Sequence, residues 1–132
     1  MGVKKVRILM AKFGEGHEAS LMKLATAFSE AGFEVIYTML QDPEAIVTSA
    51  LQESVDHIGI TTLSGTQIKD FTKIFDLLAK EKMSHIGVTA GGFLHDEDIE
   101  RIKEMGVIEF FPVGTTYGEL IDWSRKHIRH TE

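Results

Sequence analysis

The sequence predicts an α/β protein built on a parallel β-sheet, and three observations support this prediction. Short apolar runs alternate along the chain with longer segments in which apolar residues recur at helical spacing. The short runs are rich in β-branched residues, as expected for strands that are covered on both faces. The chain has 132 residues, so we expect one domain spanning residues 1–132. An eight-stranded barrel, the other fold with this alternation, needs roughly 250 residues.

The first half of the chain predicts two strands, each followed by a helix. VRILM (6–10) is the first strand, and FEVIY (33–37) is the second. Gly32 suits the left-handed cap that ends a helix, and Asp42 with the proline after it suits a helix start. The apolar stripe of the first helix is Leu21, Leu24, Ala25 and Phe28, and that of the second is Ile46, Val47, Ala50 and Leu51.

The second half predicts three more strands and three more helices. The strands are HIGIT (57–61), HIGVTA (85–90) and VIEFF (107–111). Asp96 is expected to cap the fourth helix and Gly106 to end it. The apolar residues of the three helices are Ile68, Phe71, Phe75 and Leu78, then Ile99 and Ile102, then Tyr117, Leu120, Ile121 and Ile128.

Five alternating units joined by right-handed crossovers predict a flavodoxin-like (Rossmann-like) fold. This is a three-layer, doubly wound parallel sheet of five strands in the order 2-1-3-4-5. Ligands of such sheets bind at the carboxyl ends of the strands, where the strand order reverses. The loops to consider are therefore AKFGEGHEAS (11–20), TLSGTQ (62–67), AGGFLHDED (90–98) and FPVGTTYGE (111–119).

Composition excludes several classes of function. The chain has no cysteine, which rules out disulfides, thiol catalysis and thiolate metal sites. Fourteen Lys and Arg against 20 Asp and Glu give a net charge of −6 without a long basic block, so nucleic acid is not an expected partner. No apolar run approaches the roughly 20 residues of a membrane span, and no secretory signal is recognisable. We expect a cytoplasmic protein without a membrane partner.

Residues that could carry chemistry cluster in the predicted loops. The loop after the first strand holds Glu15, His17 and Glu18. A single histidine there is also consistent with an exposed turn that has no ligand role. Glycines and hydroxyl residues follow three further strands, and small residues at adjacent strand ends allow a bulky ligand to approach the backbone. The glycines and hydroxyl residues are Thr61, Thr62, Ser64, Gly65, Gly91, Gly92, Gly114 and Thr115, and Pro112 is a neighbouring proline.

In combination these motifs resemble the cobalamin-binding domain of adenosylcobalamin-dependent acyl-CoA mutases, of the methylmalonyl-CoA or 2-hydroxyisobutyryl-CoA type. The family pattern is DxHxxG, then SxL, then GG. Here ExHxxS (15–20), TxL (61–63) and GG (91–92) correspond to it, with 27 residues, 64 to 90, between the last two. The resemblance covers nearly the whole chain, including GGFLHDEDIERIKEMGV (91–107) and FFPVGTT (110–116).

The resemblance implies a role for each motif. In the family, cobalamin binds with its dimethylbenzimidazole base displaced from cobalt and its nucleotide tail between the first and third strands. The loop histidine, here His17, is then the lower axial metal ligand, and Glu15 stands where an aspartate orients it. Ser20 replaces the family's glycine and could cap the following helix. The implied cofactor-binding residues are Glu15, Gly16, His17, Glu18, Ser20, Thr61, Leu63, Ser64, Gly65, Gly91, Gly92, Phe93, Pro112, Gly114 and Thr115.

The function implied by the resemblance is that of an adenosylcobalamin-binding small subunit of an acyl-CoA mutase, a carbon-skeleton isomerase. It would be inactive without a separately encoded large subunit that binds the acyl-CoA, and a homo-oligomer is also possible. A corrinoid carrier for methyl transfer is an alternative, although such carriers usually have a helical domain ahead of the first strand. A flavodoxin-like regulatory module that no longer binds cobalamin is another.

Two other uses of the fold are disfavoured by particular residues. A phosphoreceiver needs an aspartate where the third strand ends in Thr61 and Thr62. A flavin site would place phosphate in the first loop, where Glu15 and Glu18 repel it. The remaining histidines are expected to be structural: His57 and His85 partly exposed at strand starts, His95 at a helix entry, and His127 and His130 near the end of the last helix. Tyr117 and Trp123 are expected in packing, and Met10, Met39 and Met105 in the core.

Overall fold

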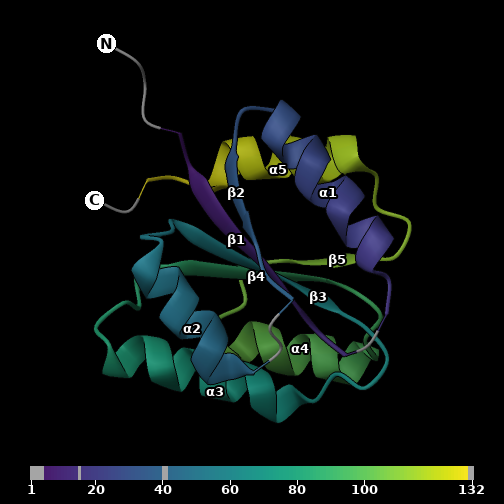
Figure 1. The fold of residues 1–132 in the computed structure, drawn as a ribbon. Helices are drawn as coiled ribbons and strands as arrows, with labels where there is room; N and C mark the ends of the chain where they lie inside the picture. Colours follow the sequence, from purple (N-terminus) through teal and green to yellow (C-terminus); the bar gives the residue numbers. More distant parts are fainter. Residues whose placement is uncertain (1–4, 15, 40–41, 131–132) are drawn as a thin grey trace.

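The computed structural model describes residues 5–14, 16–39 and 42–130, and in that part of the chain five parallel strands form one sheet. The strand order is β2-β1-β3-β4-β5, with a helix after each strand, as Figure 1 shows, which confirms the predicted flavodoxin-like fold. The elements are β1 (Arg7–Phe13), α1 (Glu18–Glu30), β2 (Glu34–Tyr37), α2 (Pro43–Gln52), β3 (His57–Thr62), α3 (Ile68–Lys80), β4 (Gly87–Gly92), α4 (Asp96–Met105), β5 (Phe110–Pro112) and α5 (Tyr117–His127).

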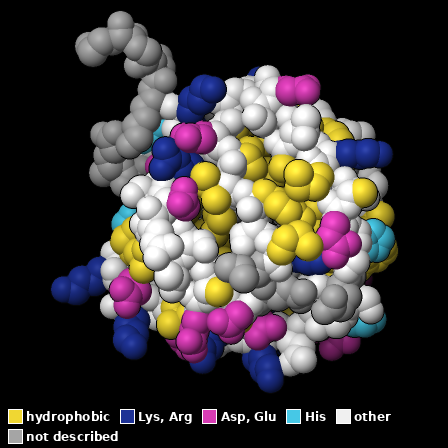
Figure 2. Space-filling model, in the orientation of Figure 1, with side chains coloured by type: hydrophobic (Ala, Val, Ile, Leu, Met, Phe, Trp, Pro, Cys, Tyr) yellow, Lys and Arg dark blue, Asp and Glu magenta, His cyan; other side chains and the backbone are white. Residues whose placement is uncertain are grey.

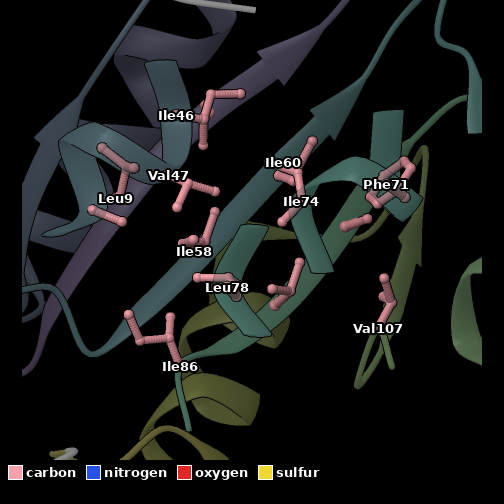
Figure 3. Close-up of a cluster of buried hydrophobic side chains, with 14 of the residues drawn as sticks. Leu9, Ile46, Val47, Ile58, Ile60, Phe71, Ile74, Leu78, Ile86 and Val107 are labelled. Atoms are coloured by element: carbon pink, nitrogen blue, oxygen red, sulfur yellow. The ribbon is translucent and has the colours of Figure 1, made fainter. Parts of the chain in front are cut away.

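The larger part of the core lies on one face of the sheet, beneath α2, α3 and α4 (Figure 1). Figure 3 shows side chains from β1, α2, β3 and α3 pointing toward one another in this cluster. Its labelled members are Leu9, Ile46, Val47, Ile58, Ile60, Phe71, Ile74, Leu78, Ile86 and Val107. Removal of this apolar surface from water is the main driving force for folding.

The face covered by α1 and α5 holds a smaller buried cluster. Successive side chains of a strand point to opposite faces. Leu9 of β1 therefore enters the larger core, while Ile8 and Met10 face α1 and α5. There they pack in one cluster with Phe28 and Phe33, whose ring centroids are 5.3 Å apart. This smaller cluster leaves a space between the sheet and the two helices.

Several element ends confirm the predicted signals. The Asp42 side chain accepts a hydrogen bond from the backbone N–H of Ala45 at 3.2 Å, which caps α2. Gly32 and Gly106, next to the ends of α1 and α4, have φ of 103° and 132°. Such angles favour glycine because other residues are strained there.

Two strands begin two or three residues later than predicted. β4 begins at Gly87 because the backbone N–H of Ile86 donates to the Met83 carbonyl, in the turn after α3, and is not available to the sheet. β5 begins at Phe110. Before it, the backbone N–H of Val107 still donates to a carbonyl of α4, and that of Ile108 already donates to the Val88 carbonyl of β4.

Three residue expectations were wrong. The N-cap residue of α4 is His95, and Asp96 is the first helical residue, where its charge suits the helix dipole. Ser20 does not cap α1, because that helix begins at Glu18. Met39, expected in the core, is 51% exposed because it lies beyond the end of β2.

On the face that Figure 2 shows, apolar side chains gather mainly in one region. In Figure 2, charged side chains follow the lower edge, where α2 and α3 lie, and apolar side chains gather around α1. The large apolar residues that are most exposed are Met22, Met39, Phe93, Ile108, Val113 and Tyr117. Within the described ranges, no helix is both long and apolar enough to span a membrane.

Candidate functional site

A cavity of about 310 Å³ lies between the sheet and the helices α1 and α5. Sites for small molecules typically have roughly 300–1,000 Å³. The sheet side is formed by alternate residues of the three central strands, namely Ile8 and Met10, then His57, Gly59 and Thr61, then Thr89 and Gly91. The helix side is formed mainly by Leu21, Leu24 and Phe28 of α1, and by Leu120, Ser124 and Ile128 in and after α5.

The cavity opens at the carboxyl ends of the strands. Two lining residues at that end, Phe93 and Val113, are 57% and 59% exposed. At the opposite end the lining residues Ile8, His57 and Ile128 are 2%, 2% and 6% exposed. The mouth is thus at the sheet edge where ligands of this fold bind, and the cavity is closed toward the amino ends of the strands.

Gly59 keeps the middle of the cavity open. It lies in the centre of β3, paired with Met10 on one side and Thr89 on the other. A Cβ atom on Gly59 would meet nothing nearer than the Thr89 hydroxyl oxygen, at 3.8 Å. A central strand normally carries β-branched residues at such positions. A glycine in the interior of a strand often marks a site where a ligand or another backbone segment approaches closely.

Most of the predicted site residues line this cavity. They are His17, Ser20, Thr61, Leu63, Gly91, Gly92, Phe93, Pro112, Gly114 and Thr115. Four others, Gly16, Glu18, Ser64 and Gly65, do not line it. Glu15 lies outside the described residues. The structure therefore brings together the glycines and hydroxyls of four separate loops around one mouth.

The loop after β3 supports the loop after β1 from behind. Gly14 has φ of 95°, and a Cβ atom there would collide with the backbone of Leu63 and Ser64. The Thr66 hydroxyl lies 3.1 Å from the Phe13 carbonyl oxygen and accepts a hydrogen bond from the Leu63 N–H at 3.0 Å. Ser64 belongs to this support rather than to the cavity wall, and Thr66 is a member of it that the sequence motifs did not indicate.

His17 is held in an uncommon backbone conformation at the mouth. Its φ and ψ are 60° and 25°, in the left-handed region, where a residue with a Cβ atom pays about 1–2 kcal/mol. It stands immediately before α1, and its side chain does not cap the helix. Ser20, in contrast, is helical and unstrained. Strain of this kind persists where the surrounding structure enforces it, commonly at functional sites.

Lys12 is the group that fixes the residues on both sides of His17. Its side chain is 2% exposed, and its Nζ lies 3.0 Å from the Glu18 Oε1 and 3.4 Å from the Gly16 carbonyl oxygen. The hydrogen bond from Lys12 holds the pKa of Glu18 below its usual value, helped by a backbone hydrogen bond and by the charge of Lys12. The sequence motifs did not indicate Lys12, although strand alternation places it on the same face as Ile8 and Met10.

His57 is a buried neutral histidine at the closed end of the cavity. It is 2% exposed, and burial lowers its pKa to about 4. Its Nε2 lies 2.9 Å from the Thr89 hydroxyl oxygen. The ring has room because Gly87 has no side chain: a Cβ atom there would come within 2.9 Å of the His57 Nδ1. The expectation that His57 is partly exposed was wrong.

The other histidines are not assembled into a metal site. Among the described residues, no group of three or more His, Asp or Glu is placed to hold a metal ion. His127 stacks on Trp123 with ring centroids 4.4 Å apart, and Trp123 meets Phe111 edge-on. The packing role expected for Trp123 is confirmed.

Comparisons with known proteins point to one family. The family model described as "B12 binding domain" matches residues 6–121. The chain is 40% identical over 119 residues to the 2-hydroxyisobutanoyl-CoA mutase small subunit of Aquincola tertiaricarbonis, covering 89% of this chain and 88% of that protein. It is 31% identical to the pivalyl-CoA mutase small subunit of Xanthobacter autotrophicus, covering 92% and 82%.

Matches to longer proteins cover only a part of them. The chain is 30% identical to the methylmalonyl-CoA mutase large subunit of Streptomyces virginiae but spans 16% of its length. Among solved structures, a cobalamin-binding protein from Desulfitobacterium hafniense superposes with a TM-score of 0.77 at 17% identity, covering 96% of this chain and 60% of that one. That likeness shows the fold.

Replacement of Lys12 tests its hold on the loop. The Lys12→Met variant keeps most of the apolar stem but loses the ammonium group, so we expect the pKa of Glu18 to rise toward its usual value. The backbone amides of Gly16 and His17 should exchange faster with solvent. NMR titration of the Glu18 carboxyl and hydrogen exchange measure both effects. Lys23→Met, an exposed change on α1, is the control, and an unchanged Glu18 pKa in Lys12→Met would refute the role.

Burial of neutral His57 should make stability depend on pH. Its pKa is about 4 when folded and about 6.5 when unfolded, so the unfolded chain binds the extra proton between these values. The free energy of unfolding therefore falls as pH drops from 6.5 toward 4, by about 2 to 3 kcal/mol at pH 4.5. His57→Gln has no group that titrates in this range at position 57, so this part of the fall in the free energy of unfolding should be absent. Urea unfolding of both proteins at pH 7 and 4.5 measures it, and equal losses in the two would contradict the assignment.

Proposed function

Because the chain belongs to the B12-binding domain family, we propose that it is the cobalamin-binding small subunit of an adenosylcobalamin-dependent acyl-CoA mutase. The observation that carries the proposal is the cavity, which begins at His17 and continues along the bare floor at Gly59. Two relatives of similar length carry the name of mutase small subunits. The acyl-CoA would then be bound by a separately encoded large subunit.

The donor set at the mouth fits this cofactor. Among the described residues, His17 is not joined by the further ligands that a bare metal ion would need. A single imidazole suits a metal that arrives already held in a macrocycle. The cavity behind it, lined mostly by apolar side chains, suits a flat aromatic base. The residues present therefore fit cobalamin bound with its base displaced from cobalt and its nucleotide tail between the sheet and α1 and α5.

The chain's own residues would position the cofactor. The Thr61 hydroxyl lines the entrance and is available as a hydrogen-bond partner for the tail. The Thr115 hydroxyl also lines it and donates to the Pro112 carbonyl oxygen at 2.7 Å, so it can act as an acceptor. Gly92 and Gly114 present bare backbone at the mouth, with φ of 123° and 100°. When bound, adenosylcobalamin supplies a cobalt–carbon bond that breaks homolytically, the chemistry on which carbon-skeleton rearrangement depends.

His17 would be the lower axial ligand, through a lone pair of its neutral ring. Its left-handed conformation places the side chain outside α1, at the exposed mouth. Lys12 holds the flanking Gly16 and Glu18, so the ring approaches the metal from a constrained loop. Because Glu18 is engaged by Lys12, we retain Glu15 as the residue proposed to orient the ring.

The rim of the mouth offers a docking surface for the large subunit. Phe93, Val113 and Tyr117 are 57%, 59% and 41% exposed around the cavity. Apolar side chains gathered around a cofactor mouth are expected to be covered in the working assembly. Covering them would also exclude water from the radical chemistry.

Replacement of His17 tests axial ligation. We expect the purified chain to bind hydroxocobalamin with the spectrum of a base-off, histidine-ligated corrinoid, and His17→Ala to lose that spectrum and bind at least about tenfold more weakly. Visible titration measures both. His95→Ala, an exposed histidine that does not line the cavity, is the control. A His17→Ala spectrum identical to that of the parent would rule out axial ligation.

A series at Gly59 tests whether the tail uses the cavity. Gly59→Ala and Gly59→Val meet no atom closer than ordinary contact at the Cβ position, so folding should be retained or slightly stabilised. The added atoms occupy the floor, so cobalamin affinity should fall progressively from Gly to Ala to Val. Thermal unfolding and titration separate the two effects. Unchanged affinity in a folded Gly59→Val variant would place the tail elsewhere.

A further inference from the structure

A hydrogen-bonded polar pair forms part of the floor near the closed end of the otherwise mostly apolar cavity. His57 and Thr89 both line it, and both are buried, at 2% and 8% exposure. The His57 Nε2 and the Thr89 hydroxyl oxygen are 2.9 Å apart. A buried polar pair is costly unless its hydrogen bonds are made, so its place in a ligand cavity calls for an explanation.

Strand register shows how deep the pair lies. Thr61 and Gly91 pair near the mouth, Gly59 pairs with Thr89 one step deeper, and His57 pairs with Gly87 one step deeper again. Each step of two residues is about 6.6 Å. A flat group that enters at the mouth and lies over Gly59 therefore has the Thr89 hydroxyl beside it, and His57 one step deeper.

The Thr89 hydroxyl retains hydrogen-bonding capacity toward the cavity. If His57 donates to Thr89, the hydroxyl proton is available to a ligand; if the hydroxyl donates, its lone pairs are available as acceptors. Within the described residues, His57 is the hydrogen-bond partner found for this side chain. An apolar ligand edge leaves the pair satisfied by itself, and a polar edge gains one more hydrogen bond.

We propose that Thr89, supported by His57, favours corrinoids whose nucleotide base carries a hydrogen-bonding group. The inference rests on the proposed function. The hydroxyl of a hydroxybenzimidazole base gains a hydrogen bond from Thr89 that the methyl groups of dimethylbenzimidazole cannot make. One added hydrogen bond shifts the ratio of the two affinities roughly fivefold toward the hydroxylated base.

The test is a comparison of two corrinoids that differ only in the base. Cobalamin and its 5-hydroxybenzimidazolyl counterpart are titrated against the parent chain, Thr89→Val and Thr62→Val, with the dissociation constant read from the visible spectrum. Thr89→Val keeps the shape but removes the hydroxyl. Thr62→Val is the matched control, because Thr62 is fully buried and its hydroxyl bonds the Gly91 carbonyl away from the cavity lining.

We expect the ratio of the affinity for the hydroxylated base to the affinity for dimethylbenzimidazole to be roughly fivefold higher in the parent and Thr62→Val than in Thr89→Val, which should still bind cobalamin. A second readout does not depend on a variant: the ring nitrogen resonances of His57 should shift more with the hydroxylated corrinoid than with cobalamin. Equal base ratios in the parent and Thr89→Val would overturn this inference alone. Failure of both corrinoids to bind the parent would overturn the proposed function and this inference with it.

Discussion

The structure depends on an unequal division of apolar packing between the two faces of the sheet. The α2–α4 face is filled by large side chains that are almost completely buried, Phe71 and Ile74 at 0% exposure among them. The α1 and α5 face carries glycine at the centre of β3 and a smaller cluster. Because one face supplies most of the hydrophobic stabilisation, the other can retain an open cavity without loss of the fold. Stability and ligand capacity are thus assigned to opposite faces.

Two residues at the mouth of the cavity adopt arrangements that are unfavourable in free energy. His17 is left-handed although it carries a Cβ atom, and Lys12 is buried with a carboxylate that is itself half exposed. A buried lysine rarely repays its desolvation through one ion pair. The strain at His17 and the burial of Lys12 have one explanation, because the Lys12 ammonium group binds the residues before and after His17. The loop therefore holds His17 in one backbone conformation at the mouth.

Periodicity and turn chemistry were sufficient to predict the fold and most of the loops, but not the cavity. Apolar spacing, Asp42, Gly32 and Gly106 act within a few residues, and the structure confirms them. The sequence indicates only that Gly59 belongs to a strand. Its position in the cavity wall depends on the space that α1 and α5 leave above it. His57 was expected to be partly exposed because the sequence does not show that Ile128 lies beside it at the closed end of the cavity. The errors concern contacts between elements distant in sequence, which local patterns do not encode.

The depth of the cavity separates this chain from other uses of the same fold. Sheets with this strand order commonly hold phosphate or flavin in the loops at the carboxyl ends, and such sites need no empty space over the strands. Here the lining continues from His17 at the mouth past Thr61 and Gly59 to His57. A ligand that fills this shape needs a tail long enough to pass two strand positions. This length follows from the packing of the sheet, independently of the sequence motifs in the loops.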